Sequence, residues 1–541
     1  MQLSRQTHLG SIDTKLLTIV DLQGPPVWPC TIIQSEEAYI LHRLPDELLL
    51  LIVKFSLYTN DRTTRETTRE TWALFEDVRA CDTSCIMALS QVCHRFKRIA
   101  QPLLFSNIGF MHPNQVLPPS IRVLRLHRTL SDRVDLRQHC RYLTINMGDV
   151  ARREARTLGY YSVARDFVTW FANTKYLSIH DSQCSTHGAA ESDESGAHGS
   201  NSETCAWDLY RYAVDKLECV EYAYIDRAHC RIQLNQMIES LGFPKLKKLE
   251  LIRVHLDGHV ELEAKKHRTA PFTHLHLFNT VLTARATYIL LQWPRVLTHF
   301  VFDAYPYQPP FVDYPTLESW LLIHAETLVH IKISCLHPKR SKRLLNATLF
   351  PQLELLSLSR WQMQSGLRTD HSTSVRTDQV NLLGSSLKIF CWDFTIEDSE
   401  LSRLPFGDDE ASWIRTLSER AFEHKAALET IKILYSLDDH HRTRSKGYPW
   451  ECMEDAQRHL VKFGIELIYD KPPMSKDEWT RYYETGIAPY ADFWGPRVHY
   501  QPPRESTLEE DEAERRLDAE YDELMRQGLY HGEDIRRYLG A

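Results

Sequence analysis

From about residue 120 onward, the chain repeats a short pattern in which apolar residues occupy the first, fourth and sixth of six positions. Eleven segments follow it, one of them with threonine in the first position, and they begin at residues 121, 140, 174, 217, 246, 272, 297, 328, 353, 387 and 428. Apolar and polar residues alternate in the second half of most of these segments, which predicts a strand. A further strand is predicted from Ile465.

The spacing of these segments, mostly about 25–35 residues, is typical of a solenoid. Helical patterns lie between some of them, for example at 167–174 and 315–327. A single strand–helix unit cannot bury its apolar edge alone, so such units stack and share a core. The sequence therefore predicts an α/β fold, an irregular solenoid with a parallel sheet. The alternative is an ordinary α/β domain in which the eleven strands are unrelated.

A different pattern lies near the amino end, where "LPDELLLLIVKF" predicts a helix. Pro45 suits the first helical position, and Asp46 and Glu47 suit the positive end of the helix dipole. Around this helix, Leu48, Leu51, Ile52 and Phe55 form one face and Leu49 and Val53 form another. A helix that is apolar on all sides must be buried on more than one of them.

A second helix is predicted by an apolar stripe that recurs at helical spacing. The stripe consists of Leu89, Val92, Cys93, Phe96, Ile99 and Ala100. Because proline lacks the backbone N–H, Pro102 is expected to end the helix.

Four regions follow from these patterns. Residues 1–40 form a weakly patterned N-terminal segment, and 41–110 form a helical module with a polar insertion at 56–86. The solenoid spans 120–470 and contains an insertion, 181–205, that is almost free of apolar residues and is expected to be disordered. Residues 471–541 combine a segment rich in proline and aromatic residues with an acidic, helical tail.

Composition narrows the class of protein. The net charge is −8, of which −7 falls in residues 505–541, so no general affinity for nucleic acid is expected. The 12 cysteines have no regular spacing, which favours reduced thiols in the cytoplasm or nucleus. No apolar stretch approaches the length of about 18 residues that a membrane span needs, so no membrane partner is expected.

Motifs for chemistry are missing from the sequence. It contains no phosphate-binding glycine loop, no HExxH motif and no GxSxG motif. Cys81, Cys85, Cys93 and His94 have the wrong spacing for a zinc ribbon. We therefore expect no catalytic residues, no cofactor and no metal.

The two N-terminal segments together resemble a known family. The Leu-Pro-x-Glu-Leu-Leu start, the Val-Cys-x-x-Phe centre of the second segment and the closing Leu-Leu-Phe are similar to an F-box of the fungal type. This resemblance implies docking on a Skp-type adaptor, which bridges to a cullin–RING ubiquitin ligase. The contact residues it implies are Leu44, Pro45, Leu48, Leu49, Ile52, Leu89, Val92, Phe96, Leu104 and Phe105. The alternative is that all of them form this module's own core.

The repeats downstream are similar to the leucine-rich repeats often found behind an F-box, although the usual asparagine ladder is largely missing. In such repeats, the residues between the apolar positions line the concave face. The row that this implies begins at Arg125 and includes Glu221, Val301, Cys391 and Lys432, with His274, His299 and His330 as neighbours. From this face the candidate substrate-binding residues are Arg125, Glu250, His276, Lys332, Ser357 and Asp393. Its mixed charge favours a protein substrate over nucleic acid.

Three functions remain open at this point. The first is a substrate-recognition subunit of an SCF-type cullin–RING E3 ubiquitin ligase, which performs no covalent chemistry itself. The second is a protein-interaction scaffold with an F-box-like module that never joins a ligase. The third is an α/β enzyme whose site shows no motif, and it predicts a deep pocket with convergent titratable groups.

Overall fold

The structure, a computed structural model, describes most of the predicted helices and strands. The described residues are 44–58, 83–111, 121–146, 154–180, 205–226, 231–257, 263–304, 312, 314–334, 336, 344–363, 379–395, 406–435 and 447–485. The predicted N-terminal segment 1–40, most of the insertions 56–86 and 181–205, and the predicted acidic helix lie outside these residues. Two compact units meet in sequence between Val220 and Glu221, and each is described by itself.

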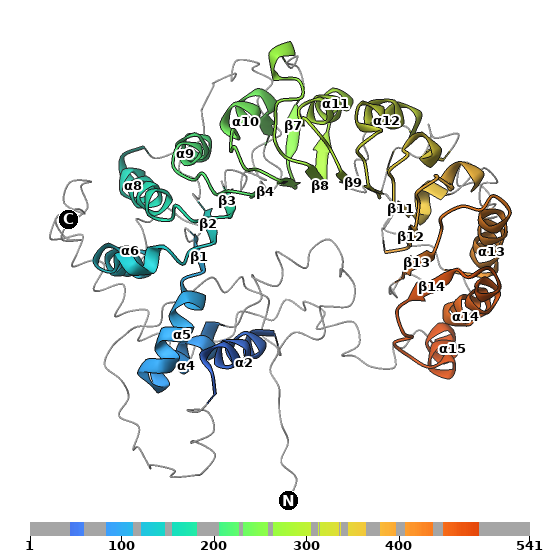
Figure 1. Cartoon of the computed structure of the whole chain (residues 1–541), viewed down its shortest axis with the longest axis horizontal. Helices are drawn as coiled ribbons and strands as arrows, with labels where there is room; N and C mark the ends of the chain where they lie inside the picture. Colours follow the sequence, from blue (N-terminus) through green and yellow to red (C-terminus); the bar gives the residue numbers. More distant parts are fainter. Residues whose placement is uncertain are drawn as a thin grey trace, which may run out of the picture. The chain divides into compact units, whose positions relative to one another are not determined.

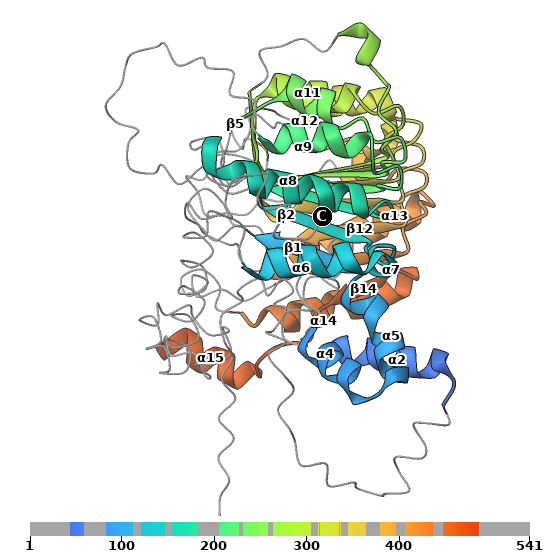
Figure 2. The ribbon, with the colours of Figure 1, turned by 90° about the vertical axis from the view of Figure 1, so that its left-hand side faces the viewer.

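Among its described residues, the first unit contains three N-terminal helices and three parallel strands in the order β1-β2-β3. Its elements are α2 (Asp46–Tyr58), α4 (Thr83–Val92), α5 (His94–Leu104), β1 (Asn107–Met111), α6 (Ile121–Asp132), α7 (Val134–Arg137), β2 (Tyr142–Asn146), α8 (Glu154–Trp170), β3 (Tyr176–His180) and α9 (Cys205–Val214). Figure 2 shows α6 and α8 running side by side over these strands. Cys205, placed by prediction in the insertion 181–205, begins α9.

The second unit holds a longer run of parallel strands in the order β4-β6-β8-β9-β10-β11-β12-β13-β14. These strands are β4 (Tyr222–Asp226), β6 (Lys248–Ile252), β8 (His274–Leu282), β9 (His299–Ala304), β10 (His330–Ile333), β11 (Leu355–Ser359), β12 (Ile389–Asp393), β13 (Thr430–Leu434) and β14 (Glu466–Tyr469). The short strands β5 (Arg231–Gln233) and β7 (His255–Asp257) pair beside the start of this path.

Helices lie between the strands of the second unit and, in the case of α15, after the last of them. They are α10 (Leu234–Ser240), α11 (Ala284–Gln292), α12 (Tyr314–Leu321), α13 (Asp408–Glu423), α14 (Pro449–Leu460) and α15 (Lys476–Thr485). The 3-10 helices are η2 (Ala264–Lys266), η3 (Leu322–His324), η4 (Ala347–Leu349), η5 (Arg360–Met363), η6 (Gln379–Leu382) and η8 (Val461–Phe463). Within this unit, the strands line the inside of a curve and the helices lie outside (Figure 1). This arrangement confirms the predicted α/β, solenoid-like fold with a parallel sheet.

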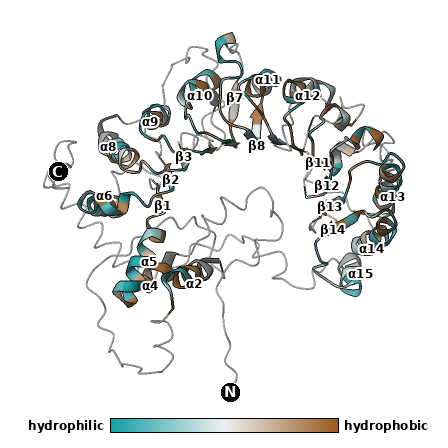
Figure 3. Cartoon of the chain, viewed as in Figure 1, coloured by the Kyte–Doolittle hydropathy of each residue, from teal (hydrophilic) through white to brown (hydrophobic). Residues whose placement is uncertain are grey.

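The core of the second unit lies between the strands and these helices. Leu249, Leu275, Phe300 and Ile331 occupy one register row, and each is fully buried. Since side chains alternate along a strand, the residues on either side of this row point to the opposite, inner face of the sheet. Figure 3 shows the mixture of hydrophobic and hydrophilic positions on the covering helices.

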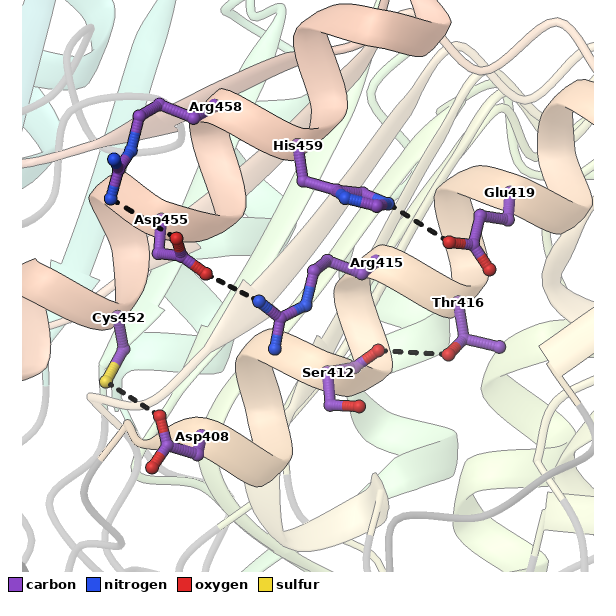
Figure 4. Close-up of polar contacts among 9 residues, drawn as sticks. All are labelled: Asp408, Ser412, Arg415, Thr416, Glu419, Cys452, Asp455, Arg458 and His459. Atoms are coloured by element: carbon purple, nitrogen blue, oxygen red, sulfur yellow. Dashed lines mark hydrogen bonds and ion pairs between the residues drawn. The ribbon is translucent and has the colours of Figure 1, made fainter.

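Neighbouring repeats are also joined on the outside by polar contacts between helices. Figure 4 shows α13 and α14, where Arg415 Nη1 donates to Asp455 Oδ2 at 2.5 Å and His459 Nε2 lies 3.1 Å from Glu419 Oε1. The side chains of both pairs are partly exposed to solvent, so each pair adds little to stability.

The prediction of a strand at 121–126 was wrong, because these residues begin helix α6. Val123, Leu126 and Leu130 are buried at spacings of three and four residues, the periodicity of a helix. A window of six residues is too short to separate that pattern from a strand. The strand of this repeat is β1, which pairs with β2 although it lies in the range predicted for the helical module.

The strand predicted from Leu217 was placed three residues too early. Val220, Ala223 and Ile225 are the buried positions, so β4 starts at Tyr222. The apolar pattern can be aligned to this segment in two ways that differ by three residues. In the correct alignment, a small residue, Ala223, occupies a core-facing position. As a result, Tyr224 and not Glu221 lies beside Glu250 in the sheet.

The apolar stripe at 89–100 is divided between two helices and does not belong to one. Cys93 has extended backbone angles and forms the N-cap of α5, so α4 ends at Val92. Pro102 does not end α5 but lies in its last turn, which continues to Leu104. The turn closes with hydrogen bonds from Phe105 N to Gln101 O at 3.0 Å and from Ser106 N to Leu103 O at 3.2 Å.

Candidate functional site

The first candidate surface is built on α2, α4 and α5, which pack against one another. Leu49 and Val53 of α2 are fully buried against Phe96 and Ile99 of α5. A second cluster joins Ile86 of α4 to Ala100 and Leu104 of α5. Three of the implied contact residues, Leu49, Phe96 and Leu104, are therefore core residues of this unit.

Charged groups fix the start of α2 on α5. Arg95 Nε donates to Asp46 Oδ1 at 2.8 Å, and its Nη2 donates to the carbonyl oxygen of Leu44. Arg98 Nη2 donates to the other oxygen of Asp46. These bonds hold the Leu44-Pro45 segment in place although Pro45 itself is exposed.

Large apolar side chains remain exposed beside this core. Leu48 and Leu51 of α2 are 45% and 47% exposed, and Val92 at the end of α4 is 66% exposed. Figure 3 shows hydrophobic residues along α2. Leu49 and Val53 are residues of α2 that pack against α5. The side of α2 that carries Leu48 and Leu51 therefore remains exposed.

The remaining implied contact residues are less exposed or are not described. Leu44, Leu89 and Phe105 are half-buried and pack against the two core clusters. The side chain of Ile52 lies outside the described residues. Apart from Ile52, the structure thus places Pro45, Leu48 and Val92 at the surface and the other implied contact residues partly or wholly inside.

The second candidate surface is the inner face of the sheet in the second unit. Strand register places Glu250 beside His276, and Lys332 between Val301 and Ser357. The sequence therefore predicted this row correctly from β6 to β13. Arg125 does not belong to it, because it lies on helix α6.

Two ion pairs with buried carboxylates lie on this face. Lys248 Nζ lies 2.9 Å from Glu250 Oε2, and Lys332 Nζ lies 3.4 Å from Asp393 Oδ2. Burial alone would lower the pKa of Lys332, but the carboxylates of Asp393 and Asp303 outweigh it and raise that pKa. Burial raises the pKa of Asp303, and Lys332 only partly opposes this.

Three histidines from adjacent strands lie next to these pairs. The ring centroids of His274 and His299 are 3.9 Å apart in a stack, and those of His299 and His330 are 5.5 Å apart, edge to face. They occupy the same register row as Lys248. Sequence reasoning named these histidines only as neighbours and missed Lys248 and Asp303. Both could have been found, since each lies two residues from a named position on the same strand face.

Cys391 of β12 lies in the same register row as Ser357 and is buried. Burial raises the pKa of the Cys391 thiol to about 12, so it is no nucleophile at neutral pH. The described residues hold no group of three or more His, Cys, Asp or Glu side chains arranged to bind a metal ion. No helix in the described part of the chain has the length and hydropathy of a transmembrane span.

Comparison with known proteins gives no family assignment. No protein-family model matches this sequence, and no curated protein matches it either.

Proposed function

We propose that this chain is the substrate-recognition subunit of an SCF-type cullin–RING E3 ubiquitin ligase. In this proposal, α2, α4 and α5 form an F-box-like module that docks on a Skp-type adaptor. The repeat region, similar to leucine-rich repeats, holds a protein target on its inner sheet face. The chain contributes no catalytic group; it brings the target's lysines close to the ubiquitin-loaded enzyme.

The observation that carries the proposal is the exposure of Leu48 and Leu51 on a helix whose other side is already packed. Burying such side chains stabilises a complex by about 25 cal/mol per Å² of apolar surface, so a partner surface would cover them favourably. An apolar helix face that docks into a groove is a common mode of protein recognition. The bonds from Arg95 hold the neighbouring Leu44-Pro45 segment ready for the same contact.

Co-purification of the full chain with a Skp-type adaptor tests this proposal. The variant combines Leu48→Asp with Leu51→Asp, because both side chains are exposed and the core is left intact. Adaptor recovery should fall at least ten-fold. The control, Val461→Asp, changes a 70% exposed residue of the second unit and should leave recovery unchanged. Equal recovery with the double variant would contradict docking through this face.

The scaffold alternative makes a different prediction in the same experiment. A chain with an F-box-like module that never joins a ligase would recover no adaptor even without substitution. It would still capture a target through the sheet face.

A further inference from the structure

The stacked histidines of the inner sheet face lie beside two lysines, each of which is paired with a carboxylate. The ammonium of Lys248 acts on His274, His276 and His299, and that of Lys332 acts on His330. Apart from these lysines, the charged groups that shift the four rings are the neighbouring rings themselves. No carboxylate of the described residues stabilises their protonated forms in this way.

The acidic residues of this face lie below its surface. Glu250, Asp303 and Asp393 are only 2–7% exposed. Glu250 is held by Lys248, and Asp393 is held by Lys332. His274, His276, His299 and His330 are each partly exposed residues. A ligand approaching the face therefore meets imidazoles before it meets carboxylates.

Neighbouring threonines fix which ring nitrogen can take up a proton. The Thr298 hydroxyl donates to the carbonyl oxygen of Thr273 at 3.1 Å, so its oxygen accepts from His299 Nδ1–H at 2.9 Å. His274 Nδ1 lies in the same way 2.8 Å from Thr273 Oγ1. The neutral rings thus carry their proton on Nδ1, and protonation adds a second N–H at Nε2.

We propose that the histidine row of His274, His299 and His330, flanked by Lys248, binds a carboxylate-rich segment of the target protein. This inference deepens the proposed function and rests on it, because it names the chemical class of target that the sheet face would take. Charge complementarity supports it: an anionic side chain stabilises the protonated form of the rings, which the lysines disfavour, whereas a cationic side chain would disfavour that form further.

Binding and protonation are linked at this site. Burial first, then the charges of His299 and Lys248, lower the pKa of His274 to about 4; burial and the neighbouring rings lower that of His330 to about 3. These rings are neutral at pH 7. An adjacent carboxylate raises a histidine pKa by about 1 to 3 pH units, so the complex holds more protons than the free protein. Affinity must therefore increase as the pH falls.

The test is a calorimetric titration of the full chain with an acetylated, amidated peptide of ten glutamates at pH 6 and pH 8. If binding raises the pKa of one ring from about 4 to about 7, Kd is about ten-fold lower at pH 6 than at pH 8. A peptide of ten glutamines should bind at least ten-fold more weakly at pH 6. The heat should also vary with the ionisation enthalpy of the buffer, as proton uptake requires.

The matched variants locate the effect. His274→Gln combined with His299→Gln should remove most of the pH dependence, and His424→Gln, at an exposed histidine that caps α13, should leave it unchanged. Circular dichroism checks that the double variant is folded. If it is not, His330→Gln alone should still weaken binding at least two-fold.

Three results would overturn the inference: equal binding of the glutamine peptide, a pH dependence that survives in the folded double variant, or no binding of the glutamate peptide. Loss of adaptor recovery is a separate result. If the peptide binds as described while the unaltered chain recovers no adaptor, the acidic-segment site stands and the ligase role fails.

Discussion

Arg360 and Glu410 show how a single pair of residues can hold two repeats together. Arg360 follows β11 and Glu410 lies in the first turn of α13, and their side chains are 1% and 5% exposed. Arg360 Nη2 donates to Glu410 Oε1 at 2.6 Å, and Glu410 Oε2 accepts from the backbone N–H of Gly407 at 3.0 Å. Each carboxylate oxygen is therefore occupied, as a buried charge requires.

Glu410→Ala should destabilise the second unit by about 3–5 kcal/mol, because it leaves the buried guanidinium of Arg360 without its partner. Unfolding in urea, followed by circular dichroism, measures the loss. Glu354→Ala is the matched control: it removes a glutamate paired with Lys388, but both side chains are about half exposed. Its unfolding midpoint should not change. A similar midpoint for both variants would show that the buried pair does not hold the repeats.

At the scale of elements, the sequence predicted repeats better than it predicted boundaries. Strands β6 and β8–β14 were predicted because large apolar residues occupy both of the strand positions that face the core. The prediction failed where a small residue occupies a core-facing position, as Ala223 does in β4. It failed again at 121–126, where burial of Val123 and Leu130 follows a helical period longer than the window used.

The candidate surfaces were predictable to different degrees. Strand alternation was enough to place Glu250, His276, Lys332 and Ser357 in one row. Which apolar residues of α2 face the core could not be read from the sequence, because leucines occupy every side of the helix. Only packing distinguishes Leu49, which is buried, from Leu48, which is exposed.

The start of α2 provides a test of how elements are fixed to one another. Arg95→Ala removes two charge-assisted bonds, to Asp46 and to the carbonyl oxygen of Leu44, which together should cost about 1–2 kcal/mol of local stability. Hydrogen exchange at 48–53 should become about 5- to 30-fold faster.

Arg98→Ala is the control for that prediction, since Arg98 binds the same Asp46 but is 71% exposed. Its effect on exchange should be much smaller. Equal effects of the two substitutions would mean that the contact with the Leu44 carbonyl contributes nothing.

At the scale of the whole molecule, a solenoid is stabilised by contacts between neighbouring repeats, and its last repeat needs a cover. In the second unit, α15 supplies it. Trp479 of α15 is 2% exposed, and its ring lies 6.4 Å from those of Tyr448 and Trp450. The described residues 476–485 of the segment after residue 470 therefore pack at the end of the second unit's array.

Trp479→Ala should therefore destabilise the end of the array by about 3–5 kcal/mol, the usual cost of removing a buried tryptophan. Because stability is shared mainly between neighbours, hydrogen exchange should accelerate at 449–469 and remain unchanged at 222–252. Uniform acceleration across the second unit would contradict a repeat array and indicate one cooperative core.

The central claim is that the exposed leucines of α2 are covered by a second polypeptide. Hydrogen exchange of the full chain with and without a purified Skp-type adaptor tests it most directly. The account predicts slower exchange at 46–53 and around Val92 when the adaptor is present, with no change in α13 (Asp408–Glu423). Unchanged exchange along α2 at saturating adaptor concentration would contradict it.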